Sequence, residues 1–398
     1  MSFKVLLQRR FVWICAALLL GCASAVSRAA TAAKPAPAIG PGALLLPETI
    51  YAAPGQETNI YFDNVVLEPF VHQYLFDVTC AKGNQQEERW TWAPNAAGEF
   101  PLQIEVRDLQ DNIVTQGNTT LRVSPANAGA GQKISLLCIG DSLTHASIYT
   151  AELLHLFSGE NNPSLTLLGT NHVANTAPEN LHEGYGGWKY SSFLTRWTNT
   201  PPPAGRPQAG SSPFVFLENG KPVFDFPRYV KEKLHGTQPD FITVMLGTND
   251  IFSATDATVD DSIQEILANA DQLIAGVRAG APHAKIAILP PVPPTYWQDA
   301  FGNNYHSGQT RWGYRKNQFK LDWHLMQHFG NREKEGLFIV PAYANIDCMH
   351  NFPSTESAVN ARNSTKVQRA TNGVHPAAPG YQQIADSIYG WIKWELSK

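Results

Sequence analysis

Residues 136–144 are Leu-Leu-Cys-Ile-Gly-Asp-Ser-Leu-Thr, an apolar run that breaks abruptly into turn-forming and polar residues. Consecutive apolar residues bounded by turn formers predict a fully buried strand of a parallel sheet. The break places Ser142 just beyond the carboxyl end of that strand, where open α/β sheets hold their active sites. Apolar residues at helical spacing over 147–157 predict that a helix follows. Ser142 is therefore expected at a strand-to-helix turn, near backbone N–H groups that can stabilise an anion.

The same turn also suits a purely structural role. Asp and Ser are common first residues of helices, so Asp141 or Ser142 could serve only as the cap of the next helix. Only residues elsewhere in the chain can show whether this turn is a helix cap or carries a nucleophile.

Length and charge narrow the class of protein. A chain of 398 residues is long enough for two domains with sizeable cores. The net charge is −4 and only 16% of residues are charged, so the sequence offers no basic field for nucleic acid. No nucleic-acid partner is expected.

The first 25 residues resemble an export signal. Basic residues up to Arg10 precede an apolar stretch at 11–21 that is too short to span a bilayer well. Two endings stay open: Leu-Leu-Gly-Cys at 19–22 resembles a lipoprotein box with Cys22 lipidated, whereas Ala-Ser-Ala at 23–25 suits ordinary cleavage. Either ending predicts a periplasmic, extracellular or envelope-anchored protein. A lipid on Cys22 is the one membrane attachment predicted, because no later segment is long and apolar enough to cross.

The composition and residue pattern of the chain change twice after this signal. Residues 26–45 are rich in Ala, Pro and Gly, which predicts a linker. Residues 46–127 carry short alternating runs separated by turn signals, typical of a small all-β sandwich of immunoglobulin-like kind. Strands are expected at 59–62, 74–78, 89–92, 102–106 and 119–123, and a short Ala/Gly hinge at 126–131.

Strands and helices alternate over the remaining residues, 132–398. Buried strands are expected at 241–246, 285–289 and 336–340, and helices at 261–280 and 381–396. This order predicts a three-layer α/β/α domain with a parallel sheet. The segment after the 285–289 strand is expected to be a Pro-rich loop bearing six aromatic residues: Tyr296, Trp297, Phe301, Tyr305, Trp312 and Tyr314.

Four short motifs lie in this second part of the chain. They are Gly-Asp-Ser-Leu at 140–143, Glu-Gly-Tyr-Gly-Gly-Trp at 183–188, Gly-Thr-Asn-Asp at 247–250 and Asn-Gly-Val-His-Pro at 372–376. In this order they resemble the SGNH (GDSL-type) hydrolase superfamily, and the second motif is most similar to the branch of carbohydrate acetyl esterases. The resemblance covers about residues 133–396 and implies an SGNH-hydrolase domain with serine esterase activity.

Ester cleavage explains the residue types in these motifs. Ser142 as nucleophile needs a base, and His375 can accept its proton near neutral pH and later protonate the leaving alcohol. The resemblance assigns the oxyanion to the backbone N–H groups of Ser142 and Gly187 and the side-chain amide of Asn249, each worth about 3 to 4 kcal/mol. Gly186 is the neighbouring candidate. A helix-capping histidine and ordinary turns at 187 and 249 would also fit these residues.

One position departs from the family pattern. The family places an Asp three residues before the histidine, and this chain has Asn372. An amide oxygen can accept a hydrogen bond from imidazole but adds no negative charge, and this exchange costs ~10⁴-fold in a serine protease triad. Three outcomes stay open: a Ser–His dyad oriented by Asn372 or a backbone carbonyl, a carboxylate such as Asp347 or Asp250 reaching His375, or a slow or inactive enzyme.

The sequence thus predicts an exported serine esterase that removes small acyl groups, above all acetyl groups, from carbohydrate. The aromatic residues after 289 suit stacking on sugar rings, although packing explains them equally well. The alternatives are an exported esterase or lipase acting on lipid or aryl esters, and a catalytically impaired glycan-binding protein. The expected partner is acetylated carbohydrate or another small-acyl ester, and the chemistry requires no metal or organic cofactor.

Overall fold

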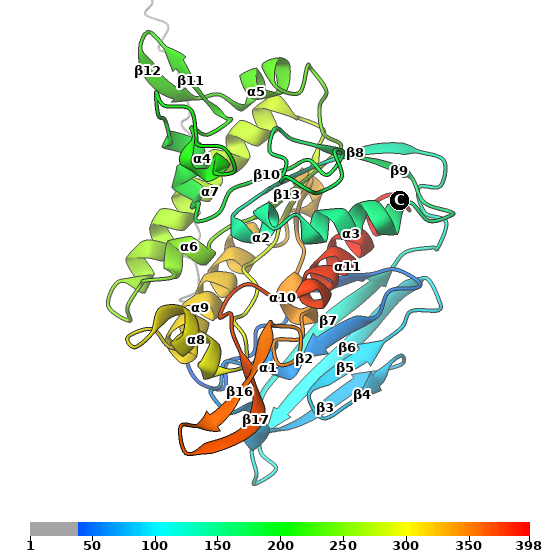
Figure 1. The fold of residues 1–398 in the computed structure, drawn as a ribbon. Coiled ribbons are helices and arrows are strands. Elements are labelled where there is room, and N and C mark those ends of the chain that lie inside the picture. The colour runs from blue at the N-terminus through cyan, green and yellow to red at the C-terminus, as the bar shows by residue number, and fades with distance from the viewer. Residues whose placement is uncertain (1–38) are drawn as a thin grey trace, which may run out of the picture. The chain divides into compact units, whose positions relative to one another are not determined.

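The computed structural model describes residues 39–398, which form one compact unit. The predicted export signal and most of the predicted linker lie outside these residues. A six-stranded sheet has the strand order β10-β8-β13-β14-β15, with β9 also paired to β8, and every pairing is parallel (Figure 1). Its strands are β8 (Lys133–Gly140), β9 (Ser164–Leu168), β10 (Glu183–Gly184), β13 (Phe241–Met245), β14 (Lys285–Ile288) and β15 (Leu337–Ile339).

Helices cover both faces of this sheet. Successive side chains of β8 alternate between two apolar cores, with Leu137 and Ile139 in one and Leu136 and Cys138 in the other. The first core packs against α4 (Tyr190–Thr195), α5 (Phe226–Glu232), α7 (Val259–Gly280) and α9 (Arg311–Phe329). The second packs against α3 (Ile148–Phe157) and α11 (Ala378–Glu395). The predicted α/β fold with a parallel sheet is confirmed.

Short elements complete this half of the molecule. The remaining helices are α2 (Ser142–His145), α6 (Thr248–Ile251), α8 (Gln298–Tyr305) and α10 (Ala342–Asn345), and the single-turn helices are η2 (Pro207–Ala209) and η3 (Glu333–Glu335). Two antiparallel hairpins join β11 (Val215–Glu218) to β12 (Lys221–Phe224) and β16 (Ser354–Asn360) to β17 (Asn363–Ala370).

The expectation of a loop after β14 was wrong over most of its length. Helices α8 and α9 occupy residues 298–305 and 311–329. Helix α9 has no single apolar face, because Leu321 and Leu325 pack into one core and Phe319 into the core of the β-sheets. Polar side chains such as Arg315 and Asp322 are also buried. A search of the sequence for helical periodicity therefore misses this helix.

Residues 49–123 form two β-sheets. The larger has the order β1-β7-β6-β3 and the smaller β2-β5-β4, and each of the five expected strands overlaps one of these. The bounds are β1 (Thr49–Ala52), β2 (Thr58–Tyr61), β3 (Leu75–Cys80), β4 (Asn84–Gln85), β5 (Arg89–Trp92), β6 (Gly98–Arg107) and β7 (Ile113–Val123), with α1 (Phe62–Val65) and η1 (Val71–Gln73) between them. Strand β1, which was not expected, pairs with β7 in parallel.

The β-sheets share their core with the α/β part. Phe319 of α9 and Tyr343 of α10 belong to the same apolar cluster as the sheet residues. The buried guanidinium of Arg315 donates to the carbonyls of Asp63 and Asn64 at 2.9 and 2.8 Å. Folding of residues 46–127 as a domain of their own stays a prediction.

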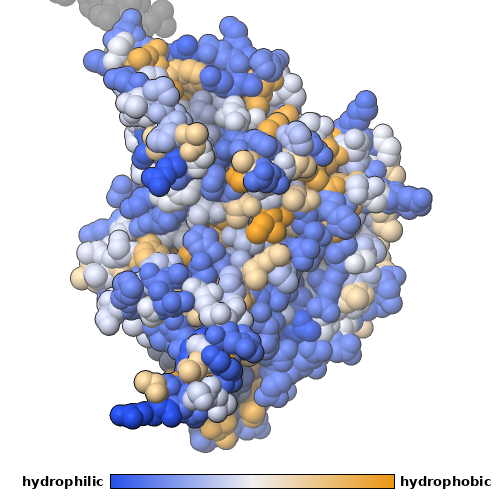
Figure 2. Space-filling model, in the orientation of Figure 1, coloured by the Kyte–Doolittle hydropathy of each residue, from blue (hydrophilic) through white to orange (hydrophobic). Residues whose placement is uncertain are grey.

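Two features describe the surface. No helix within residues 39–398 is long and apolar enough to cross a membrane. On the face drawn in Figure 2, hydrophobic residues gather in small patches near the middle, and hydrophilic residues cover most of the rest.

Candidate active site

The end of β8 places Ser142 at the start of a helix, as the apolar run predicts. Asp141 is the N-cap of α2, and its Oδ1 accepts a hydrogen bond from the Leu143 N–H at 3.0 Å. The capping role therefore falls to Asp141. Gly140 is required at this point because a Cβ there would collide with the side chain of Thr144.

The Ser142 hydroxyl lies against an imidazole from the far end of the chain. His375 Nε2 is 2.8 Å from Ser142 Oγ, although the two residues are 233 positions apart. Burial lowers the pKa of His375 below its usual value of 6.5. A neutral imidazole with an unprotonated Nε2 can accept the hydroxyl proton, so the geometry suits base-assisted attack.

Asn372 fixes which nitrogen of His375 carries its proton. Its Oδ1 accepts hydrogen bonds from the backbone N–H groups of Val374 and His375, at 3.1 and 2.9 Å. The same oxygen lies 3.2 Å from His375 Nδ1. Because two N–H donors already orient this oxygen, Nδ1 has to be the protonated nitrogen, which leaves Nε2 free as an acceptor.

Within residues 39–398, no carboxylate takes the role of the aspartate that the family pattern has at this position. The side chain of His375 is hydrogen-bonded to Ser142 and Asn372, and burial lowers its pKa. Asp347 binds the side chain of His350 at 3.0 Å, and Asp250 Oδ1 accepts from the Tyr190 N–H at 3.3 Å. Of the three outcomes, the geometry matches the arrangement in which Asn372 orients His375.

Asn249 lies in the site but is already hydrogen-bonded. Its Nδ2 donates to Asp141 Oδ2 at 3.2 Å and to the Trp188 carbonyl at 3.0 Å. These contacts bring the first three motifs together around Ser142. An amide has two N–H groups, so a bound oxyanion would have to share one of these hydrogen bonds.

Asp141, which is fully buried, and the half-buried Asp250 are two carboxyl groups near Asn249. Burial raises the pKa of each to about 7, and the charge of Asp250 further raises that of Asp141. The sequence suggested Asp141 as a cap only, and its contact with Asn249 spans 108 positions.

The glycine-rich loop of the second motif passes beside the nucleophile. A Cβ on Gly186 would lie 3.9 Å from the Cβ of Ser142, and one on Gly187 would meet nothing within 4 Å. Gly187 has a φ of +79°, a conformation that favours glycine. Both glycines therefore border open space at the site, and either remains a candidate for the second oxyanion donor. The aromatic ring of Trp188 is buried in the core.

The buried carboxylate of Glu183, the first residue of the second motif, holds this loop. Glu183 accepts hydrogen bonds from the hydroxyls of Tyr185 and Tyr229, at 2.6 and 2.7 Å, and from the Thr170 N–H at 2.6 Å. Burial raises its pKa. Tyr229 lies 46 positions away, so no local pattern could have revealed this contact.

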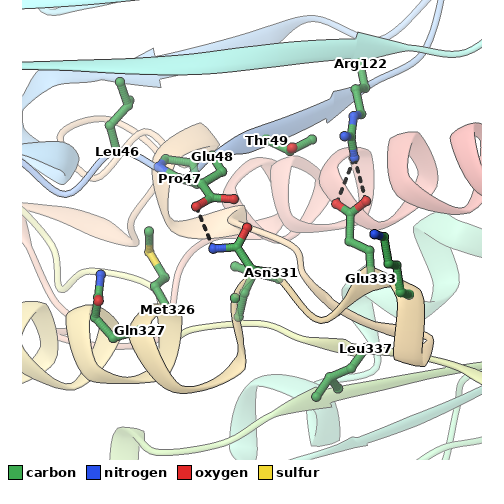
Figure 3. Close-up of a pocket in the computed structure, with 13 residues that line it drawn as sticks. Leu46, Pro47, Glu48, Thr49, Arg122, Met326, Gln327, Asn331, Glu333 and Leu337 are labelled. Carbon is green, nitrogen blue, oxygen red and sulfur yellow. Dashed lines mark hydrogen bonds and ion pairs between the residues drawn. The ribbon is translucent and has the colours of Figure 1, made fainter. Parts of the chain in front are cut away.

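A large cavity lies elsewhere. It has a volume of about 620 Å³ between the start of β1 and the end of α9, and none of its lining residues belongs to the four motifs. Figure 3 shows Arg122 reaching Glu333, with distances of 2.7 and 2.9 Å, and Asn331 reaching Glu48 at 2.8 Å. Within residues 39–398, no group of three or more His, Cys, Asp or Glu side chains is placed to hold a metal ion.

Comparison with known families agrees with this geometry. Residues 138–318 match the model of the GDSL-like lipase/acylhydrolase family. This part of the chain belongs to that family. The matched residues contain the motifs of Ser142, Gly187 and Asn249 and end before the motif of His375. The match identifies the protein as a carboxylic ester hydrolase.

Solved structures similar to this GDSL-type hydrolase include three carbohydrate esterases. A family 3 esterase from Clostridium thermocellum is 16% identical over 67% of this chain and 100% of its own, with a TM-score of 0.39. A family 3 esterase from Talaromyces cellulolyticus is 16% identical over 66% and 98%, with a TM-score of 0.37. An active-site mutant of a family 2 esterase from Clostridium thermocellum is 13% identical over 86% and 92%, with a TM-score of 0.36. No curated protein matches the sequence.

Proposed function

We propose that this GDSL-type hydrolase is an exported serine esterase that removes small acyl groups, above all acetyl groups, from carbohydrate. The observation that carries the catalytic part is the 2.8 Å contact between Ser142 Oγ and His375 Nε2, with Asn372 Oδ1 at Nδ1. Nucleophile, base and orienting group thus stand in one line, as acyl transfer requires.

The reaction has two halves. Ser142 Oγ attacks the ester carbonyl carbon while its proton moves to His375 Nε2, and the resulting oxyanion is held by the Ser142 N–H, the Gly187 N–H and Asn249 Nδ2. His375 then returns the proton to the leaving sugar oxygen as the C–O bond breaks, which leaves an acyl-serine. Water, deprotonated by His375, cleaves this ester and releases the acid.

The substrate assignment rests on the space and the exposed aromatic surface near the site. The Ser142 hydroxyl is bordered by the glycines of the second motif, which leave room for a small acyl group close to the backbone. The Trp297 ring is 45% exposed, and Thr295, two residues earlier, donates to the carbonyl of Gly373 at 3.0 Å. A partly exposed indole beside the histidine loop suits a sugar ring. Phe301 and Tyr314 are core residues and contribute no such surface.

Export is supported by the sequence of residues 1–25 alone. A test is to fractionate cells that express the full chain and to compare it with Cys22→Ala. Release of the variant from the envelope into the soluble fraction supports a lipid anchor, and equal solubility of both supports ordinary cleavage. Retention of both in the cytoplasm would contradict export.

Hydrolysis of p-nitrophenyl acetate tests the catalytic part. The wild type should be active, Ser142→Ala should lose essentially all activity, and Ser158→Ala, an exposed serine on α3's C-terminal side, should behave as the wild type. Equal rates for wild type and Ser142→Ala would refute the mechanism. An inactive wild type would favour the glycan-binding alternative, which the amide at Asn372 keeps open.

Acetate release from a panel of acetylated polysaccharides tests the substrate class. The panel is compared with p-nitrophenyl esters of increasing acyl length. Faster turnover of the long-chain esters than of acetyl esters, with no acetate from any polysaccharide, would favour the lipid or aryl esterase alternative.

A further inference from the structure

The glycine-rich loop of the second motif packs directly on the helix that begins at Ser142. The end of α2 lies against Gly184, since a Cβ there would be 2.6 Å from the backbone nitrogen of His145. Two residues further on, a Cβ on Gly186 would lie 3.9 Å from that of Ser142. The distance between the backbone N–H groups of Ser142 and Gly187, the two proposed oxyanion donors, therefore depends on the position of Gly184 against α2.

One buried imidazole holds the backbone of Gly184. His182 is 0% exposed, and its Nδ1 accepts a hydrogen bond from the Gly184 N–H at 3.0 Å. Because a backbone N–H can only donate, Nδ1 is unprotonated and the proton of the neutral ring is on Nε2. Burial lowers the pKa of His182 to about 4, so the ring is neutral near pH 7 and keeps this acceptor.

The other nitrogen of His182 reaches the end of α2. Its Nε2 lies 2.8 Å from Ser147 Oγ, and this hydroxyl donates to the carbonyl of His145, the last residue of α2, at 3.1 Å. Since the hydroxyl proton of Ser147 is used on this carbonyl, its Oγ accepts from Nε2–H. A continuous chain of hydrogen bonds therefore runs from the Gly184 N–H through the imidazole to α2.

The turn at Ser147 depends on these side-chain contacts. Its φ is +60°, a left-handed conformation that is costly for a residue with a Cβ and persists where the surroundings hold it. The Ser147 carbonyl accepts a hydrogen bond from the buried side chain of Asn180 at 2.9 Å. Asn180 and His182, both in the segment that leads into the second motif, thus hold the turn that follows α2.

We propose that His182 is a positioning residue for ester hydrolysis, which holds the Gly184 N–H and thereby sets the loop that carries Gly187 against the helix that carries Ser142. This inference rests on the proposed Ser142 mechanism, and His182 lies outside the four motifs. Its contact with the N–H two residues later has the geometry of an Asx turn, which Asn forms through Oδ1. An Asn at this position can therefore replace the Nδ1 acceptor, whereas the longer Gln side chain places its amide near Ser147 instead.

The experiment compares kcat and KM on p-nitrophenyl acetate for His182→Gln and His182→Asn, each expressed per folded molecule by near-UV circular dichroism. His182→Gln should lower kcat by about 10- to 100-fold and change KM by less than about twofold, because a displaced oxyanion donor affects the transition state more than the bound ester. His182→Asn should keep kcat within about threefold of the wild type. A role in folding alone would lower the amount of folded protein and leave kcat per folded molecule unchanged.

A neighbouring histidine supplies the matched control. His172→Gln makes the same exchange at an exposed position of the preceding segment and should keep the wild-type kcat. If His182→Gln does not fold, Ser147→Gly decides instead, since glycine suits the φ of +60° and the change removes only the hydroxyl that anchors Nε2. It should lower kcat at least about fivefold, and an unchanged kcat would then overturn the inference.

Two results with His182 itself would also overturn the inference. One is a His182→Gln variant whose kcat stays within about threefold of the wild type. The other is a His182→Asn variant that falls as far as His182→Gln, because the volume of the ring and not its contact with Gly184 would then matter. An inactive wild type, or a Ser142→Ala variant as active as the wild type, would instead refute the proposed function on which the inference rests.

Discussion

Replacing Asn372 with Asp tests how the base is supported. Asn372 Oδ1 lies 3.2 Å from His375 Nδ1, so an aspartate of the same shape would place a negative charge beside the imidazole. Its oxygen could keep both backbone hydrogen bonds that the amide now accepts. The change therefore adds a charge while preserving the loop.

The size of the effect can be bounded. Replacing a neutral hydrogen bond by a charged one gains about 1 to 2 kcal/mol. The attraction between an imidazolium and a carboxylate ~4 Å apart is about 4 kcal/mol at an effective dielectric constant of ~20, before the carboxylate's desolvation is subtracted. We expect Asn372→Asp to raise kcat/KM on p-nitrophenyl acetate by between about 10-fold and 1000-fold. The gain should stay below the ~10⁴-fold cost known from a protease triad, because Asn372 already selects the correct tautomer.

The pH profile gives an independent readout. Burial now lowers the pKa of His375 below 6.5, and an adjacent carboxylate favours the protonated ring. The acid limb of kcat/KM should therefore move to higher pH in Asn372→Asp. Asn372→Ala is the matched control and should lower kcat/KM, since it removes the acceptor at Nδ1. An Asp variant with unchanged rate and unchanged acid limb, or a fully active Ala variant, would refute the assignment of Asn372 as the orienting group.

Three further changes probe other parts of the structure. Asn249→Ala should lower kcat by about 10² to 10³ with little change in KM, and a loss of less than about threefold would exclude it as an oxyanion donor. Burial lowers the pKa of His182 from 6.5 to about 4, so the unfolded chain binds a proton that the folded chain refuses as pH falls through this window. Urea unfolding should show the wild type losing about 2 to 3 kcal/mol more than His182→Gln between pH 7 and pH 4.5, and equal slopes would contradict this. Arg315→Met should cost about 3 kcal/mol or more in thermal unfolding because the carbonyls of Asp63 and Asn64 lose their donor, whereas the neighbouring Lys316→Met should cost less than about 1 kcal/mol.

Most of the sheet could be predicted because its strands are apolar on both faces. The strands at β8, β13, β14 and β15 each appear as a short buried run, and their parallel order follows from the helices between them. Parallel strands share one carboxyl edge, so the motifs that follow β8 and β13 had to lie near one another. That argument reaches Ser142 and Asn249 without any structure.

The parts that could not be predicted depend on buried polar groups. Helix α9 packs apolar residues on two sides and also buries Arg315 and Asp322, so its pattern shows no single apolar face. The pairing of Asp141 with Asn249 and the cluster around Glu183 join segments whose separation a local pattern does not reveal. The place where the β-sheets meet α9 and α10 follows from such contacts as well.

Asn372, the position that departs from the family pattern, also has a structural role. Its Oδ1 accepts hydrogen bonds from two backbone N–H groups and faces His375 Nδ1, so one oxygen both stabilises the turn and orients the imidazole ring. Those three contacts need an acceptor of this shape and do not need a charge. The amide therefore preserves the orientation of His375 while it gives up electrostatic stabilisation of the imidazolium. A slower enzyme with correct geometry is the expected consequence, which is why adding charge at this one position should increase the rate without changing the fold.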